Sequence, residues 1–339
     1  MPPTKHRHCA KGFFIFGSAI FFLCIGFYGG YIYRPRGKAI ASQLRLNGNY
    51  TFINPLLLSD ASELKDSREF TSLKSKAQEL LEKHKSSGDA TQTSLYFRDL
   101  NGGRWFGVGE NDIYAPASML KVPTMIAFYK LAETNPKILS AVVTYKGGAD
   151  ENKDESIKPL KAIEPGKSYT IEELIHYMIA YSDNNARRLL HENIDPKYLL
   201  EVFTDLGIDI PANSDQADFM SPKKYSYFYR ILYNGTYLSR TMSEKALSLL
   251  STPDFPQGLE AGVPTDTVVA QKFGERQLAD PKSNEIYEKE LHDCGIIYYP
   301  KSPYLLCVMT KGPDLSRLSS VIADISRLIY AEIQTTKRG

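Results

Sequence analysis

The segment Ser118-Met119-Leu120-Lys121 places a hydroxyl and an amine three residues apart. On one helix this spacing puts both groups on the same face. A neutral Lys amine can then take the proton of the Ser hydroxyl and generate a nucleophile. Two further Ser-x-x-Lys segments begin at Ser62 and Ser221, and we interpret both as exposed helix or turn residues. Ser118 differs because it follows Pro116-Ala117 and opens an apolar helix, which predicts a serine nucleophile beside a buried core.

A second polar element, Ser182-Asp183-Asn184, occurs once and falls where a helix should end. That helix begins at Thr170, since Thr170 and Glu173 have the spacing of a capping box. The Ser182 hydroxyl could relay a proton, and the Asn184 amide could bind a lysine and a substrate amide. The alternative is that the Ser-Asp pair only caps a helix.

The third element is Lys272-Phe273-Gly274, which ends an apolar strand. Lys-x-Gly also occurs at Lys146 and Lys337, so the pattern gains meaning only from this position. A lysine there would attract a substrate carboxylate and help to keep Lys121 neutral. Gly274 would let a substrate backbone approach closely, and the strand edge after it can donate an N–H.

Taken together and in this order, the three elements resemble those of the penicillin-recognising serine enzymes, the class A β-lactamases and penicillin-binding proteins. The resemblance runs from about Phe70 to the C-terminus and includes the segments 181–186 and 292–297. It implies Ser118 as nucleophile, Lys121 as its base and Ser182 as proton relay. It also implies an oxyanion hole from the backbone N–H groups of Ser118 and Glu275, no metal and no cofactor, and substrate binding by Asn184, Lys272, Phe273 and Gly274.

Two departures from that family pattern bear on activity. Class A enzymes carry a water-activating Glu in the loop between the second and third elements, whereas residues 205–222 hold no Glu and four aspartates: Asp205, Asp209, Asp215 and Asp218. Phe273 stands where the family has Thr or Ser, so one hydroxyl contact to the substrate carboxylate is missing, at a cost of about 1 kcal/mol. Its ring could also block the site.

The resemblance therefore implies that β-lactams, D-Ala-D-Ala peptidoglycan stems or both acylate Ser118, with slow deacylation. Two alternatives stay open. One is a β-lactam or muropeptide sensor that remains acylated. The other is an inactive relative.

The order of expected elements predicts an α/β (α+β) fold of the β-lactamase/transpeptidase type. A helix is expected near 67–86, strands near 93–97 and 104–108, and a buried helix over 118–133. Further helices are expected near 221–234 and 243–251, then strands near 268–273, 291–299 and 304–310, and a closing amphipathic helix. The antiparallel sheet would be flanked by the terminal helices of a catalytic domain over 67–339. An all-helical lobe, about 119–265, would be inserted into it.

The N-terminal region predicts a membrane anchor. Residues 13–33 hold 21 residues without a charge, enough to cross about 30 Å of hydrocarbon. We favour an uncleaved anchor over a signal peptide, whose apolar region is usually about 7–15 residues, although Ala39-Ile40-Ala41 has the small residues of a cleavage site. Residues 1–12 would be a cytoplasmic tail and 34–66 a linker that partly docks. The protein would be a single-pass cell-membrane protein with an extracytoplasmic catalytic domain.

The composition and the distribution of charge exclude several classes of protein and argue against one class of binding partner. Hydrophobic residues make up 42% and charged residues 24% of the 339 residues, which excludes a disordered chain. The sequence has one long apolar run, which excludes a polytopic membrane protein. Residues 1–38 carry six Lys/Arg and no acid, so acids outnumber bases by four in the remainder. A basic excess confined to the anchor argues against a nucleic-acid partner.

Three smaller expectations complete the sequence analysis. Cys294 and Cys307 lie in a predicted hairpin; if Tyr299 pairs with Tyr304, Cys307 falls opposite Ile296 and both thiols are free. The segment 151–158 is interpreted as a solvated charged loop. The histidines show no metal-ligand spacing: His84, His176, His191 and His292.

Overall fold

The computed structural model describes residues 43–46, 48–59, 70–211, 217–280, 282–283 and 285–338. All of them belong to one compact unit, Ala41–Gly339. The predicted tail and anchor, residues 1–33, lie outside the described residues. Within the described residues, no helix combines the length and apolar character that crossing a membrane requires.

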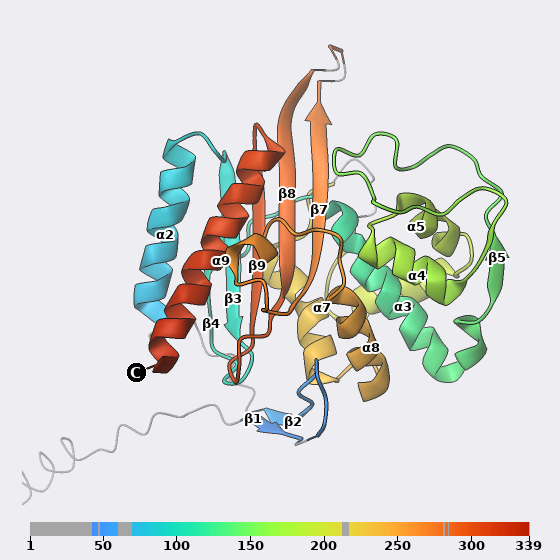
Figure 1. Cartoon of the computed structure of the whole chain (residues 1–339), viewed down its shortest axis with the longest axis horizontal. Helices are drawn as coiled ribbons and strands as arrows, with labels where there is room; N and C mark the ends of the chain where they lie inside the picture. The colour runs from blue at the N-terminus through green and yellow to red at the C-terminus, as the bar shows by residue number, and fades with distance from the viewer. Residues whose placement is uncertain are drawn as a thin grey trace, which may run out of the picture. The chain divides into compact units, whose positions relative to one another are not determined.

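A five-stranded antiparallel sheet forms the centre of the domain, in the order β4-β3-β9-β8-β7 (Figure 1). Its strands are β3 (Gln92–Asp99), β4 (Trp105–Val108), β7 (Val269–Ala279), β8 (Ile286–Ile297) and β9 (Tyr304–Gly312). Successive residues of a strand face opposite sides: Leu95 and Phe97 belong to one buried core, and Tyr96 to the other. The β7–β8 hairpin is longer than predicted and extends beyond the rest of the domain (Figure 1).

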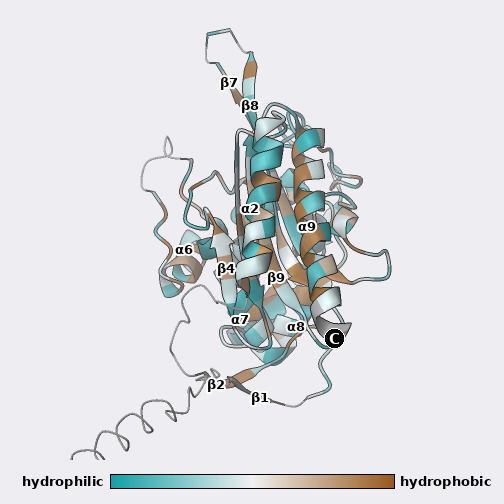
Figure 2. Ribbon diagram, turned by 90° about the vertical axis from the view of Figure 1, so that its left-hand side faces the viewer, coloured by the Kyte–Doolittle hydropathy of each residue, from teal (hydrophilic) through white to brown (hydrophobic). Residues whose placement is uncertain are grey.

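Two helices cover one face of this sheet. They are α2 (Thr71–Ser86) and α9 (Leu315–Arg338), which lie side by side over the strands (Figure 2). Leu73, Ala77 and Leu81 of α2 share a buried core with Ile322 and Ile325 of α9. The helical spacing of these apolar residues accounts for the match between prediction and structure.

The inserted lobe covers the other face. Its helical elements are η2 (Ala117–Leu120), α3 (Lys121–Thr134), η3 (Pro136–Ile138), α4 (Ile171–Ala180), α5 (Asn184–His191), α6 (Pro196–Asp205), α7 (Pro222–Asn234) and α8 (Arg240–Leu250). The short η4 (Glu260–Gly262), which follows them, packs against α9 instead. The predicted fold class is confirmed, and the Thr170–Glu173 capping box is present. The lobe is not all-helical, however, because β5 (Val142–Thr144) and β6 (Ser168–Thr170) pair as a small second sheet. Three-residue strands leave too short a pattern to detect.

The described part of the predicted linker packs on the domain. β1 (Gln43–Arg45) pairs with β2 (Leu56–Ser59). Arg45 donates hydrogen bonds to the Leu100 carbonyl (2.7 Å) and to Asn234 (3.1 Å). The Glu244 carboxylate accepts from the backbone N–H groups of Phe52 and Ile53. This segment is therefore attached by polar contacts as well as by the buried Ile53.

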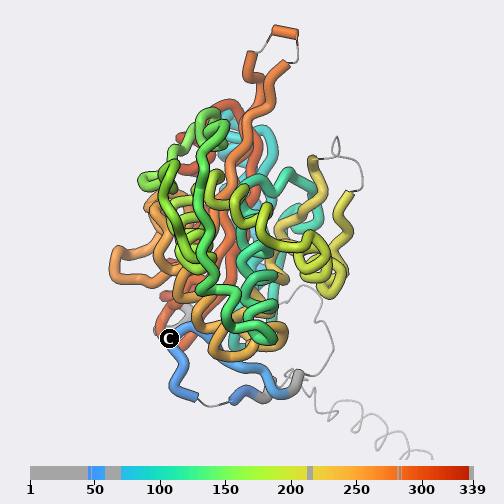
Figure 3. The backbone as a smooth tube through the Cα atoms, turned by 90° about the vertical axis from the view of Figure 1, so that its right-hand side faces the viewer, coloured from blue at the N-terminus to red at the C-terminus, as the bar shows by residue number. Residues whose placement is uncertain are grey.

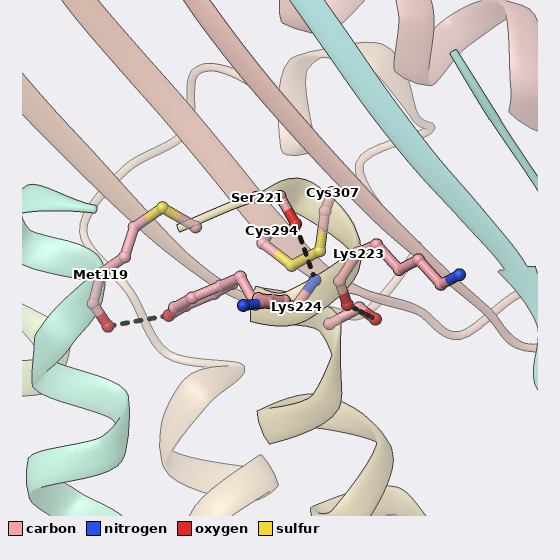
Figure 4. Close-up of a disulfide and its surroundings, with 8 residues drawn as sticks. Met119, Ser221, Lys223, Lys224, Cys294 and Cys307 are labelled. Atoms are coloured by element: carbon pink, nitrogen blue, oxygen red, sulfur yellow. Dashed lines mark hydrogen bonds between the residues drawn. A yellow bond between two sulfur atoms is a disulfide. The ribbon is translucent and has the colours of Figure 1, made fainter. Parts of the chain in front are cut away.

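The prediction of two free thiols is wrong. Cys294 lies directly opposite Cys307, and the two form a disulfide beside the start of α7, close to Met119 (Figure 4). Tyr304 pairs with Ile297 rather than with Tyr299, so the connection is longer than assumed. A shift of two residues keeps every side chain on its own face, so the apolar pattern alone could not distinguish the two registers.

The prediction that Ser221, which begins another Ser-x-x-Lys segment, is an exposed residue is also wrong. Ser221 is buried, and its hydroxyl accepts the Lys224 backbone N–H at 3.2 Å as the N-cap of α7. It therefore has a structural role that the short pattern does not reveal. The copy at Ser62 lies outside the described residues.

Candidate active site

Ser118 lies in the short turn η2, directly before α3. Ala117 before it has a φ of 48°, a left-handed conformation that is unfavourable for a residue with a Cβ. The edge strand β7 packs tightly on this turn: a Cβ at Gly274 would lie 2.7 Å from the Pro116 carbonyl oxygen. Gly274 is thus required for the close approach of β7 to the serine turn, whereas the sequence analysis assigned its lack of a side chain to the approach of a substrate backbone.

Lys121 is fully buried at the first turn of α3 and points to Ser118. Its Nζ is 2.8 Å from Ser118 Oγ, 2.7 Å from the Ser182 carbonyl oxygen and 2.9 Å from Ser182 Oγ. Burial lowers the pKa of Lys121 well below its usual range, and the charge of Lys272 lowers it further. The structure therefore favours a neutral amine within proton-transfer distance of the Ser118 hydroxyl.

Ser182 connects the two lysines. It follows the end of α4 with a φ of 58°, so it turns both its carbonyl and its hydroxyl toward Lys121. Lys272 Nζ donates to the same hydroxyl at 3.0 Å. Three segments far apart in sequence thus meet in one group of side chains, here termed the lysine–serine cluster: Ser118, Lys121, Ser182 and Lys272.

Lys272 is buried on β7, and burial lowers its pKa to about 7. The carboxylates of Asp293 and Glu155 oppose this shift. The neighbouring Phe273 is also buried and stacks on Phe255, with ring centres 4.0 Å apart. The Lys272 ammonium lies 4.1 Å from the centre of the Phe273 ring. Phe273 thus packs into the core, and an aromatic ring replaces the hydroxyl of the family pattern beside this ammonium.

Asp183 and Asn184 anchor a long segment between β5 and β6. Asp183 caps α5, and its carboxylate also accepts from the Asn152 side chain and the Ile163 backbone, both at 2.8 Å. The Asn184 backbone N–H donates to Asn152 Oδ1 at 2.8 Å. The prediction that 151–158 is a solvated loop is confirmed for five of its eight residues, which are exposed. It missed that buried Asn152 fixes the segment beside the Ser-Asp-Asn element.

This segment brings a carboxylate to the lysine–serine cluster that sequence reasoning missed. Glu155 Oε1 accepts from the Asn184 side-chain amide at 2.6 Å. Two residues later, the Ile157 backbone N–H donates to Glu275 Oε1 at 2.5 Å. Residues 155–157, here termed the crossing segment, therefore connect α5 with β7; the segment to which they belong runs in front of the lobe in Figure 3. No motif marks Glu155 among the neighbouring charged residues.

The loop between α6 and α7, where the family pattern has its Glu, directs its described carboxylates elsewhere. Asp218 pairs with Lys311 at 2.5 Å and with Arg276 at 3.3 Å. Asp205 accepts from the Tyr237 hydroxyl, and Asp209 is exposed. Asp215 lies outside the described residues.

A buried carboxylate–imidazole pair supports the residues that precede Ser118. Glu290 and His292 of β8 contact each other at 3.1 Å, and both bind the backbone of Ala115, through its N–H (3.2 Å) and its carbonyl (3.1 Å). In the sequence, His292 belongs to the segment 292–297 that resembles the family, and no pattern there predicts this contact.

Among the described residues, no three His, Cys, Asp or Glu side chains gather closely enough to hold a metal ion.

Fold and cluster together define a serine hydrolase of the penicillin-recognising type, and comparison with known proteins agrees. The beta-lactamase enzyme family matches residues 72–333, so the chain belongs to that family. None of the curated proteins compared with the chain matches it.

Solved structures show the same fold at low identity. PBP-A is 22% identical, with a TM-score of 0.63, and the match covers 78% of this chain and 97% of PBP-A. The class A beta-lactamase of the last common ancestor of Gram-negative bacteria is 22% identical, with a TM-score of 0.62, over 76% of this chain and 98% of that one. A beta-lactamase from Sphaerobacter thermophilus is 21% identical, with a TM-score of 0.62, over 75% and 95%.

Proposed function

We propose that this protein is a membrane-anchored acyl-transfer enzyme whose nucleophile is Ser118. The observation that carries the proposal is the buried Lys121 amine 2.8 Å from the Ser118 hydroxyl. Its substrates would be β-lactams, D-Ala-D-Ala peptidoglycan stems or both. A variant of the similarly folded PBP-A forms an acyl-enzyme complex with penicillin G, which supports this substrate class.

In the proposed reaction, Ser118 Oγ attacks the carbonyl carbon of the substrate while Lys121 takes the hydroxyl proton. The backbone N–H groups of Ser118 and Glu275 would stabilise the oxyanion. When the C–N bond breaks, the leaving nitrogen receives a proton through the Ser182 hydroxyl, which lies between the lysines. Asn184 would bind the acyl-side amide, and Lys272 the carboxylate. Water or an amine then releases the acyl group and restores the Ser118 hydroxyl.

Deacylation is proposed to be slow. None of the described aspartates of residues 205–222 is shown to contact the lysine–serine cluster: Asp218 pairs with Lys311 and Arg276, Asp205 at the end of α6 binds Tyr237, and Asp209 is exposed. Activating water normally needs a base within hydrogen-bond reach of it. A sensor that remains acylated is the second candidate function, and the same observation favours it.

The test is the intact mass of the full chain, followed over time after addition of benzylpenicillin, beside Ser118→Ala. Ser221→Ala is the matched control, because Ser221 begins the same Ser-x-x-Lys pattern but caps α7. A lasting adduct that is absent only in Ser118→Ala supports slow deacylation or a sensor. An adduct that forms and disappears means turnover. No adduct in the unaltered chain would refute β-lactam recognition.

The proposed location is the cell membrane, with the catalytic domain outside the cytoplasm. The 21 uncharged residues at 13–33 support an anchor, and the Cys294–Cys307 disulfide is typical of an oxidising compartment. The test is membrane fractionation of the full chain and of a chain lacking residues 1–41, with thiol labelling of both. Release of the full chain by a high-salt wash, or free thiols at Cys294 and Cys307 in cells, would contradict the proposal.

A further inference from the structure

The backbone of Ala115, three residues before Ser118, is held at both its N–H and its carbonyl by side chains of β8. The N–H donates to Glu290 Oε2 at 3.2 Å, and the carbonyl oxygen lies 3.1 Å from His292 Nε2. Ala115, Glu290 and His292 are all buried, so solvent does not compete for these contacts. The two contacts are here termed the Ala115 clamp.

The hydrogen bonds of His292 determine which ring nitrogen carries the proton. The Thr310 backbone N–H donates to Nδ1 at 3.2 Å, so Nδ1 is an acceptor and holds no proton. Nε2 is therefore the donor, and its two neighbours at 3.1 Å, the Ala115 carbonyl oxygen and Glu290 Oε2, are both acceptors. β9 thus orients the imidazole so that its N–H faces the Ala115 carbonyl.

Glu290 enters the clamp as a carboxylate. Burial raises the pKa of its carboxyl, but His292 and Lys311 together lower it by more, so the pKa lies below its usual range. The Lys311 ammonium lies 3.2 Å from Glu290 Oε1 and balances the charge. A hydrogen bond to an ionised acceptor is stronger than one to a neutral acceptor. The Ala115 N–H is therefore held firmly.

The residues between the clamp and Ser118 adopt a conformation that needs support. Ala117 has a φ of 48°, which is unfavourable for a residue with a Cβ. The Pro116 carbonyl oxygen accepts the Met119 N–H at 3.0 Å and leaves no room for a Cβ at Gly274. A strained conformation persists only where the surrounding contacts determine it. The clamp supplies such contacts where the chain enters the turn.

We propose that Glu290 and His292 are positioning residues for the acylation of Ser118. By fixing the Ala115 backbone they hold Ala117 in its left-handed conformation. That conformation directs the Ser118 hydroxyl to its base and the Ser118 N–H to the substrate oxygen. Both residues act through the backbone and increase the rate of the chemical step, because a displacement of about 1 Å at a reacting atom can cost about 100-fold in rate. This inference rests on the proposed acylation of Ser118.

Two substitutions of His292 separate its contact with Ala115 from its contact with Thr310. Both replace the ring by an amide. In His292→Gln, the longer side chain can place an N–H where Nε2 lies and donate to the Ala115 carbonyl. In His292→Asn, the shorter side chain can accept from Thr310 in place of Nδ1 but does not reach Ala115. The pair of variants therefore differs in the clamp itself.

The measurement is acylation of the full chain by benzylpenicillin, followed by intact mass at several concentrations. It gives the limiting rate constant and the half-saturating concentration separately. We expect His292→Asn to lower the limiting rate constant about 10- to 100-fold. The half-saturating concentration should stay the same, because Asn184 and Lys272 still bind the substrate. His292→Gln should retain most of the unaltered rate.

A second variant tests the carboxylate of the clamp. Glu290→Asp keeps the negative charge beside Lys311, but the side chain is one methylene shorter and withdraws from the Ala115 N–H. It should also lower the limiting rate constant and leave half-saturation unchanged. This variant keeps the proposal testable if His292→Asn does not fold, which circular dichroism would show.

Ser326→Ala is the control for a general loss of stability. The buried Ser326 hydroxyl of α9 donates to the Leu259 carbonyl at 2.8 Å, within the part of the domain that covers the other face of the sheet. Its loss should lower the urea concentration at which half the protein is unfolded and leave the acylation rate unchanged. If Ser326→Ala slows acylation as much as His292→Asn does, stability explains the effect and the positioning role is overturned.

Phenylmethanesulfonyl fluoride separates this inference from the proposed substrate class. Ser118 Oγ attacks its sulfur, Lys121 takes the hydroxyl proton and fluoride leaves, so the adduct does not require recognition of a β-lactam. If only this reagent labels Ser118, the proposed substrates fail, and the same variants test the clamp with it. If His292→Asn reacts as fast as the unaltered chain, or no more slowly than His292→Gln, the positioning role is overturned. If neither reagent labels Ser118, both proposals fail.

Discussion

Two loops of the inserted lobe contribute carboxylates near the edge strand β7, and they use them in opposite ways. The segment between β5 and β6 places Glu155 on Asn184, beside the lysine–serine cluster. The loop between α6 and α7 commits Asp218 to ion pairs with Lys311 and Arg276. The family pattern has its water-activating carboxylate in the second loop, whereas here the first loop carries the carboxylate that contacts the Ser-Asp-Asn element.

The difference shows that the place of a carboxylate in the sequence does not determine its place relative to the two lysines. A carboxylate influences Lys121 and Lys272 if it lies near them, whichever loop supplies it. Glu155 raises the pKa of both lysines and so meets this requirement. Asp218 instead has a structural role, because it joins its loop to β7 and β9.

The largest expected effect tests whether Lys121 is the base that activates Ser118, since both loops were compared by their position relative to this lysine. Lys121→Met should slow acylation of Ser118 about 1,000-fold, because the hydroxyl loses its base. The measurement is the rate of adduct formation by intact mass. The matched control is Lys224→Met, in the Ser-x-x-Lys copy that begins at Ser221, which should react at the unaltered rate. Unchanged acylation in Lys121→Met would mean that a loop carboxylate, not Lys121, is the base.

The next effect tests whether Asn152 holds the segment between β5 and β6 in place. Asn152→Ala removes two buried hydrogen bonds, to Asp183 and to the Asn184 backbone. We expect the free energy of unfolding to fall by about 2 kcal/mol, measured by urea denaturation. The exposed Asn111→Ala should change stability by less than about 0.5 kcal/mol. If Asn152→Ala unfolds at the same urea concentration as the unaltered chain, Asn152 does not hold this segment.

A smaller effect concerns pH. Acylation needs Lys121 neutral and Lys272 charged, so its rate should rise with pH through the pKa of Lys121 and fall as Lys272 loses its proton near pH 7. Because Glu155 raises both pKa values, Glu155→Gln should lower them and move both limbs of the pH profile to lower pH. Stopped acylation time courses across pH provide the measurement. A shift to higher pH would contradict the placement of Glu155 beside the lysines.

The smallest effect concerns the second loop. Asp218→Asn weakens two partly exposed ion pairs and should cost less than about 1 kcal/mol in the free energy of unfolding. The adduct lifetime and the pH profile should match those of the unaltered chain. A markedly longer adduct lifetime would reverse the comparison, because it would place the water-activating group in the loop between α6 and α7.

Several elements could be predicted from sequence because their signals are local. The apolar stripes of α2 and α9 and the capping box of α4 depend on residues within a few turns of one helix. The three short motifs were identified by type and order, and the structure brings their polar residues Ser118, Lys121, Ser182 and Lys272 within hydrogen-bond distance of one another.

Other features depend on contacts between distant segments. The Cys294–Cys307 disulfide follows from a strand register that the apolar pattern fits equally well two residues away. Phe273 could be read as an obstacle until its stacking on Phe255 was known. Ser221 repeats the nucleophile motif but caps a helix.

By itself the sequence determined the fold class and the residue types of the cluster, because helical periodicity and the Ser-x-x-Lys spacing are encoded within short stretches. Only the tertiary structure decided which carboxylate stands beside that cluster. Glu155 is one of several acids in a charged stretch, and nothing local distinguishes it from Asp154. Its role arises because buried Asn152 ties the segment to Asp183 and Asn184, and hydrogen bonds between residues about 30 positions apart leave no pattern in the chain.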